Sequence, residues 1–292
     1  MLRKLIIMGC AAIALGAIAG CGGKKHKAIG AQMYSMRNEI TQNGYKSVLA
    51  DLAECGYTSV ETASYDDEQG LIYGDTPENF KAECEKLGIT PVSCHISHAL
   101  TQEELDSGNF TQALKWWDKA IDVHRRAGMS YIVCPWFKVP DNLQQLLTYC
   151  NYFNEIGRRV KDAGMLFGYH NHSHEFEKVE EQVVYDFMLE HTDADHVFFE
   201  MDVYWAVMGK ASPVEYFKKY PGRFALLHIK DKYEIGGSGM VGFDAIFRNA
   251  EVAGLKGIVV EQEAAEEGTT MKEGMAASVK YLDEAPFVKA AY

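Results

Sequence analysis

Residues 197–202 read Val-Phe-Phe-Glu-Met-Asp, an apolar run that ends in two carboxylates two positions apart. In an extended strand, the side chains of residues i and i+2 point to the same face. Glu200 and Asp202 are therefore predicted to share one face of a strand, at its carboxyl end. Similar short apolar runs recur along the chain, and their spacing indicates the fold.

Strand-like runs alternate with amphipathic helical stretches and recur at intervals of about thirty residues. They begin near Ile29, Thr58, Thr90, Tyr131, Met165, Val197, Phe224 and Gly257. Eight strands are the number that a closed parallel barrel with this alternation requires. The predicted fold class is α/β, a (β/α)8 TIM barrel that forms a single domain over residues 28–292.

Helix signals between these runs support the alternation. Thr76-Pro77 and Ser212-Pro213 each place a capping residue before a proline at the first helical position. The alternative fold, an open doubly wound sheet, usually has a glycine-rich phosphate loop after its first strand, but that turn reads Tyr-Ser-Met-Arg-Asn at 34–38. The predicted helices include Tyr45–Glu54, Pro77–Leu87, Phe110–Ala127, Asn142–Ala163 and Pro213–Tyr220.

The amino terminus resembles a secretory signal. Arg3 and Lys4 precede an apolar or small run over 5–19, which is short for a membrane span. The sequence Ile-Ala-Gly-Cys at 18–21 resembles a bacterial lipobox, in which the cysteine becomes lipidated. We expect a signal peptide over 1–20, a lipid anchor at Cys21, a tether over 21–27, and a protein that faces the periplasm or the cell exterior. An ordinary cleaved signal peptide is the alternative.

Charge and cysteine content exclude other classes. The chain has 29 Lys and Arg against 41 Asp and Glu, and removal of the two basic signal residues makes the net charge −14. Such a chain would repel a phosphate backbone, so a nucleic acid partner is not expected. The cysteines beyond Cys21 are odd in number, lack CxxC spacing and lie within apolar patterns, so we interpret them as buried hydrophobic residues.

Ionisable residues at the ends of the last four predicted strands are the strongest functional signal. The four pairs are His170 and His172, Glu200 and Asp202, His228 and Lys230, and Glu261 and Glu263. A barrel carries its functional groups at the carboxyl ends of its strands, so these side chains would meet in one cavity. Without a cation, such clustering would cost several kcal/mol in desolvation and repulsion. Imidazoles and carboxylates fit manganese, our first choice, or magnesium, cobalt, iron or zinc.

These motifs resemble those of the xylose isomerase-like barrel superfamily of sugar isomerases and epimerases. The matching stretches are 29–37, 169–172, 175–176, 202–205, 227–231 and 260–262. The resemblance implies a metal ion held by one residue from each of the last four strands, here His170, Asp202, His228 and Glu261. Many relatives have a glutamate where this chain has His170, and His172 and Glu175 are alternative ligands from that strand. This departure puts two-base epimerisation in question.

The predicted catalytic residues surround this metal. A base must remove the proton beside a carbonyl group, and His172, Glu175 and Glu261 are the candidates. Lys230 could polarise the developing oxyanion, or it could be a surface lysine paired with Asp231. The expected substrate contacts lie at the other strand ends and are Glu61, His95, Trp136, Tyr204 and Trp205.

The predicted function is that of a metal-dependent sugar isomerase or epimerase that forms an enolate. Because the chain carries an export signal, we expect an unphosphorylated sugar. A keto-glycoside (3-keto-sugar) lyase or hydratase would use the same chemistry. A sugar-binding lipoprotein without activity is the alternative from another class, and a metal-dependent nuclease conflicts with the charge. An oligomer is compatible with the sequence.

Overall fold

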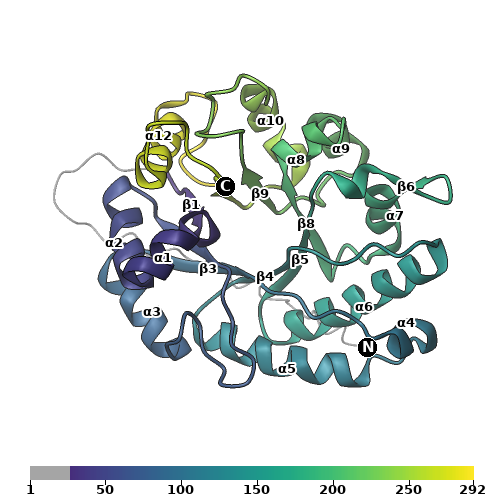
Figure 1. Ribbon diagram of the computed structural model, residues 1–292. Helices are drawn as coiled ribbons and strands as arrows, with labels where there is room; N and C mark the ends of the chain where they lie inside the picture. Colours follow the sequence, from purple (N-terminus) through teal and green to yellow (C-terminus); the bar gives the residue numbers. More distant parts are fainter. Residues whose placement is uncertain (1–26) are drawn as a thin grey trace, which may run out of the picture.

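The computed structural model describes residues 27–292, which form a closed barrel of eight parallel strands surrounded by helices (Figure 1). The strands pair in the order β1-β10-β9-β8-β5-β4-β3-β2, and β1 closes the ring by pairing with β10 and β2. This closed ring confirms the predicted (β/α)8 TIM barrel and excludes the open sheet. The barrel strands are β1 (Gly30–Gln32), β2 (Ser59–Thr62), β3 (Thr90–His95), β4 (Tyr131–Cys134), β5 (Leu166–His170), β8 (Val197–Asp202), β9 (Leu226–Ile229) and β10 (Gly257–Val260).

The predicted signal peptide over 1–20 and Cys21 lie outside the described residues, as does most of the predicted tether. Within the described part, each barrel strand begins within two residues of its predicted start. No helix of this part is long and apolar enough to cross a membrane. The described cysteines are all free, and all but the half-buried Cys55 are buried, as expected for small apolar residues.

The helices begin and end at the signals expected from the sequence. The side chains of Thr76 and Ser212 accept hydrogen bonds from Asn79 N and Glu215 N, at the amino termini of helices that start with proline. The α-helices are α1 (Arg37–Asn43), α2 (Tyr45–Cys55), α3 (Pro77–Lys86), α4 (Gln102–Ser107), α5 (Thr111–Arg126), α6 (Leu143–Asp162), α7 (Val184–His191), α8 (Val203–Met208), α9 (Pro213–Lys219), α10 (Phe243–Arg248), α11 (Ala250–Ala253) and α12 (Met271–Glu284). Two short 3-10 helices, η1 (Met33–Met36) and η2 (His174–Phe176), follow β1 and β5.

A small hairpin, β6 (Lys178–Val179) and β7 (Gln182–Val183), interrupts the alternation between β5 and α7. Its turn residues Glu180 and Glu181 have positive φ angles of 45° and 68°. The sequence prediction did not include this hairpin, because its polar residues show no apolar alternation.

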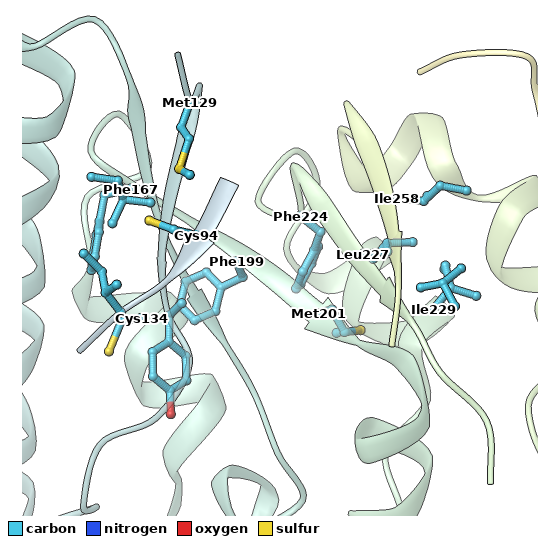
Figure 2. Close-up of a cluster of buried hydrophobic side chains, with 14 of the residues drawn as sticks. Cys94, Met129, Cys134, Phe167, Phe199, Met201, Phe224, Leu227, Ile229 and Ile258 are labelled. Atoms are coloured by element: carbon cyan, nitrogen blue, oxygen red, sulfur yellow. The ribbon is translucent and has the colours of Figure 1, made fainter. Parts of the chain in front are cut away.

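Alternate residues of each strand face opposite sides of the barrel wall. Phe199 and Met201 of β8, and Leu227 and Ile229 of β9, belong to the main core cluster, in which the strands pack against the helices (Figure 2). The intervening residues of these strands point to the barrel interior. Toward the carboxyl ends of the strands, the wall therefore separates an apolar outer layer from ionisable residues on the inside.

A second, smaller apolar cluster fills the barrel interior before the ionisable residues begin. It comprises Val133, Phe198, Ala225 and Leu226, with Tyr131 packed against it. The Phe198 ring packs against β5 at Gly168. A Cβ atom on Gly168 would approach this ring to 2.5 Å, so the ring occupies the space that a larger residue would need. This apolar layer is the floor on which the site is built.

Candidate metal centre

Buried ionisable side chains from six strands meet above this floor. Glu200 and Asp202 of β8 follow Phe198 at two-residue intervals on the same strand face, and the register pairs Asp202 with His228 of β9. The buried polar residues of the interior are Gln32, Glu61, Ser93, His170, Glu200, Asp202, His228, Lys230 and Glu261. Some of them, together with His95, form two overlapping sets of possible ligands: His95, His170, Glu200 and His228, and His170, Asp202, His228 and Glu261. We describe the second set as the upper group, and the residues below it, which His228 joins to this group, as the lower group.

The upper group consists of His170, Asp202, His228 and Glu261, the four ligands predicted from the sequence. One ligand atom from each of these residues lies within 4.8 Å of those from the other three. His228 Nδ1 is 3.5 Å from Glu261 Oε2. The structure thus brings the four predicted ligands together, each from a different strand end.

Unpartnered polar atoms show whether this group fits a metal ion. His170 Nδ1, Asp202 Oδ2 and His228 Nδ1 are buried and have no hydrogen-bond partner among the described residues. A buried polar atom without a partner typically costs about 1–3 kcal/mol, so three of them in one group are costly. Nitrogen and carboxylate oxygen donors without a thiolate suit a divalent cation of hard or borderline character, and the residues present fit such an ion.

Asp202 is both the end of a strand and the cap of a helix. Its Oδ1 accepts a hydrogen bond of 2.8 Å from Trp205 N, and this bond caps α8. Its Oδ2 remains free for a ligand. Asn171, whose role we did not predict, ties β5 to β8 at this level, since it accepts from Asp202 N and donates to Asp202 O.

Burial shifts the pKa of two residues of the upper group, Asp202 and His170, in the absence of a cation. Burial raises the pKa of Asp202 to about 7. It also lowers the pKa of His170 well below its ordinary value, and the neighbouring His228 and His95 lower it further. The imidazole of His170 is therefore neutral, as a metal ligand must be.

The lower group, which we call the inner network, consists of Glu61, His95 and Glu200 together with His228. His95 Nε2 lies 2.9 Å from Glu61 Oε1 and 2.8 Å from Glu200 Oε2. His228 Nε2 lies 2.7 Å from Glu61 Oε1 and 3.2 Å from Glu200 Oε2. Burial alone would raise the pKa of Glu61, but the two histidines hold it below its ordinary value.

Glu61 and His95 were predicted as substrate contacts, and the structure places both in the inner network. The Glu61 side chain is 0% exposed and that of His95 is 8% exposed. Glu200 was noticed as the partner of Asp202 on β8 but was assigned no role. The i, i+2 pattern predicts that a side chain faces the barrel interior. How deep that side chain lies depends on the register between neighbouring strands, which the pattern does not give.

Lys230 lies at the site and is not a surface residue. Its Nζ is 3.2 Å from Glu261 Oε2, 2.5 Å from Glu263 Oε1, and 4.9 Å from the centre of the Trp205 ring. Burial opposes its charge, but Glu261 and Asp202 raise its pKa above the ordinary value. Lys230 is therefore an ammonium group. Asp231 instead accepts hydrogen bonds within its own loop, from Lys232 N, Gly236 N and Ser238 Oγ.

The other predicted catalytic residue of β5, His172, lies beside the upper group. Its ring centre is 5.1 Å from that of His170 and 5.8 Å from that of Trp205. Its Nδ1 is buried without a hydrogen-bond partner among the described residues. Burial lowers the pKa of His172 to about 4, so the ring is neutral at pH 7 and can accept a proton.

Glu175 belongs to neither group. Its carboxylate accepts hydrogen bonds from the hydroxyl of Tyr169 and from His172 N. Tyr169 is on the opposite face of β5 from His170, and its ring contacts Phe153 and Phe137. The structure therefore places Glu175 behind the loop that carries His172, where it holds the backbone of that loop.

Three aromatic residues were predicted to contact substrate. Trp205 is at the site, next to His172 and Lys230. Tyr204 contacts the Trp205 ring at 5.3 Å and packs against the main core. Trp136, which follows β4, is 50% exposed. Trp205 alone among these three has a contact with the ionisable residues.

A closed barrel with ionisable residues at the carboxyl ends of its strands is the arrangement in which (β/α)8-barrel enzymes build their active sites. The chain belongs to the xylose isomerase-like TIM barrel family, which matches residues 49–285. This family contains sugar isomerases and epimerases. No protein of curated function matches the sequence.

Solved structures give the same assignment. A sugar phosphate isomerase/epimerase from Parabacteroides distasonis ATCC 8503 is 36% identical, with a TM-score of 0.84 over 94% of this chain and 99% of its own. A second sugar phosphate isomerase/epimerase from that organism is 33% identical, with a TM-score of 0.82 over 90% and 100%. The IOLI protein, solved with a zinc atom, is 14% identical, with a TM-score of 0.65 over 87% and 95%. At that identity the likeness shows the fold alone.

Proposed function

We propose that this protein is a divalent-metal-dependent sugar isomerase or lyase that removes the proton beside a carbonyl group. The observation that carries the proposal is the convergence of His170, Asp202, His228 and Glu261, three of which have buried, unpartnered ligand atoms. A divalent ion held by these residues would polarise a carbonyl oxygen and stabilise the negative charge that develops on it. The zinc atom in the IOLI protein supports a divalent ion in this fold, with manganese our first choice here.

The neighbouring residues supply the proton transfers. His172 is neutral and offers Nδ1 as the base that accepts the proton from the carbon beside the carbonyl. Lys230 is held between Glu261 and Glu263, and its ammonium group donates a hydrogen bond to the oxygen on which charge develops. The Trp205 ring lies against the Lys230 ammonium group on this side of the site.

The residues present favour isomerisation or elimination over two-base epimerisation. An epimerase with two carboxylate bases needs a glutamate on each side of the sugar, but β5 offers His170 and His172, and Glu175 lies behind the loop. Lys230, an ammonium group at the site, can protonate a departing oxygen. Its position there supports a keto-glycoside lyase as the second candidate function.

We propose an unphosphorylated substrate, because the buried cation Lys230 is already paired with two carboxylates. The sequence-predicted export signal supports the same choice. The two similar proteins from Parabacteroides distasonis are named for sugar phosphates, so phosphorylated sugars belong in the test. Arg37, which lies over Tyr34 and donates to Glu263 O, is an exposed cation that a phosphate could use.

The proposed proton removal is tested by proton NMR in heavy water. Metal-stripped protein is reloaded with Mn²⁺ and supplied with free ketoses, keto-glycosides and their phosphorylated forms. We expect deuterium at the carbon beside the carbonyl during turnover of an unphosphorylated substrate, and a loss of activity of about 100-fold or more in His172→Ala, because general base catalysis contributes about 10²–10⁴-fold.

Turnover with complete retention of that proton and no isotope effect would contradict the proposal. Asp118→Ala, which removes a surface carboxylate paired with Arg159, is the control and should leave activity unchanged. If phosphorylated sugars react faster and Arg37→Ala abolishes the preference, the unphosphorylated substrate is excluded.

A further inference from the structure

We propose that Glu61 is a positioning residue that orients His228 toward the cation and fixes its tautomer. The proposal rests on the metal centre of the proposed function and goes beyond it, because Glu61 is too deep in the barrel to contact either metal or substrate. His228 is shared by the upper group and the inner network. It therefore links the inner network to the proposed ligands.

The two ring nitrogens of His228 have different surroundings. Nε2 lies 2.7 Å from Glu61 Oε1, a short hydrogen-bond distance, whereas Nδ1 has no hydrogen-bond partner among the described residues. An ionised carboxylate accepts hydrogen bonds and cannot donate them. The proton of a neutral His228 ring therefore lies on Nε2, and the lone pair of Nδ1 points into the upper group. Histidine ligands in metalloproteins are commonly held in this way by a carboxylate.

Glu61 is itself fixed by its neighbours. Its Oε1 also accepts from Gln32 Nε2 at 2.8 Å and lies 2.9 Å from His95 Nε2, while its Oε2 accepts from the hydroxyl of Ser93. Gln32 is anchored in turn, because its Oε1 accepts from Tyr34 N. Both oxygens of a fully buried carboxylate are thus occupied. Glu61 cannot turn toward a substrate, so we replace its predicted role as a substrate contact.

The inner network could instead be a second cation site, since His95, His170, Glu200 and His228 also converge. Two observations argue against this. First, the atoms that would have to bind a second ion already lie within hydrogen-bond distance of one another. Glu61 Oε1 and Glu200 Oε2 lie 2.9 Å and 2.8 Å from His95 Nε2, and Glu61 Oε1 lies 2.7 Å from His228 Nε2. A second ion would also use His170 and His228, so each ring would bind through both nitrogens and lose its remaining N–H proton. The geometry favours one cation supported by the inner network.

The test is Co²⁺ binding, followed by visible absorption, to metal-stripped protein. We expect one Co²⁺ per wild-type chain. In Glu61→Ala we expect the affinity to fall by about 10- to 100-fold, the usual loss when such a supporting group is removed. Glu104→Ala is the matched control, because it removes another buried carboxylate, one that caps α4. It should leave Co²⁺ affinity unchanged.

The outcomes separate this inference from the proposed function. If the wild-type protein binds no Co²⁺, the metal centre itself is contradicted. If it binds one ion and Glu61→Ala binds it equally well, only the role of Glu61 is overturned. If the wild-type chain binds two ions and Glu61→Ala loses one of them, the inner network is a second cation site. That result would also overturn the positioning role of Glu61.

Nitrogen NMR of zinc-loaded wild-type protein, labelled with ¹⁵N-histidine, gives a test that does not require a variant to fold. We expect the His228 proton on Nε2 and zinc on Nδ1. The reverse arrangement would overturn the inference.

Discussion

Three buried polar atoms without a hydrogen-bond partner, on Asp202, His170 and His228, lie together in one group of possible ligands. The buried carboxylate of Glu104, by contrast, has donors for both of its oxygens, since it accepts from Thr101 N and Ala113 N. Selection for stability alone would not retain three costly atoms at one point. A cation explains them together, since it would serve all three.

His124 of α5 provides a pH prediction outside the site. Its side chain is buried, its Nδ1 donates to Ala120 O, and its Nε2 has no partner among the described residues. Burial lowers its pKa from 6.5 to about 4. The unfolded chain therefore protonates His124 more readily than the folded chain does. The contribution of His124 to the free energy of unfolding is fully present above pH 6.5 and is lost as pH falls through 4. The loss attributable to His124 is on the order of 3 kcal/mol.

Urea unfolding of the wild-type protein and His124→Phe at pH 7.5, 6 and 5 checks this prediction. The wild type should lose free energy of unfolding more steeply than the variant between pH 6.5 and 5. Parallel slopes would show that His124 is not the group responsible.

At the level of the elements, the site depends on how strands end and helices begin. β8 ends at Asp202, and the same residue caps α8, so the helix holds one carboxylate oxygen and leaves the other free. Asn171 joins the ends of β5 and β8. Just after β10, Gln262 N donates to Ser35 Oγ, and the Gln262 side chain packs so close to Gly274 that a Cβ atom there would approach it to 2.2 Å. Contacts between elements therefore fix Asp202 and anchor the backbone next to Glu261.

Gly168 gives a prediction at this level. A Cβ atom at this position would lie 2.5 Å from the Phe198 ring, in the apolar floor below the site. We expect Gly168→Ala to lower the free energy of unfolding by about 1–3 kcal/mol through overpacking. Gly242→Ala is the control, since a Cβ atom there meets nothing within 4 Å. Thermal unfolding of both variants measures the difference, and equal midpoints would contradict the packing described for the floor.

The sequence predicted the strands and the strand ends well, because apolar runs and i, i+2 pairs are local patterns. His170, Asp202, His228 and Glu261 each belong to such a pair, the family resemblance implied them as the ligands, and the structure brings them together. The inner network was not predicted, because the hydrogen bond between Glu61 and His228 joins residues 167 positions apart. The placement of Glu175 was also missed, since the turn after β5 carries its side chain to the outer face of the strand.

At the level of the whole molecule, the barrel encloses the ionisable interior and leaves one end for the site. The helices cover the outer wall (Figure 1). The apolar floor lies below the site, and the strand ends carry the proposed ligands. Similarity to the two proteins of Parabacteroides distasonis extends over at least 90% of the chain, so the family assignment covers the whole barrel.

Anomalous X-ray scattering from crystals of the described part, grown with Mn²⁺, tests the central claim most directly. The account predicts one strong peak among the side chains of His170, Asp202, His228 and Glu261, and its loss in crystals of Asp202→Asn. A peak elsewhere, or none at this position in well-diffracting wild-type crystals at saturating Mn²⁺, would contradict it.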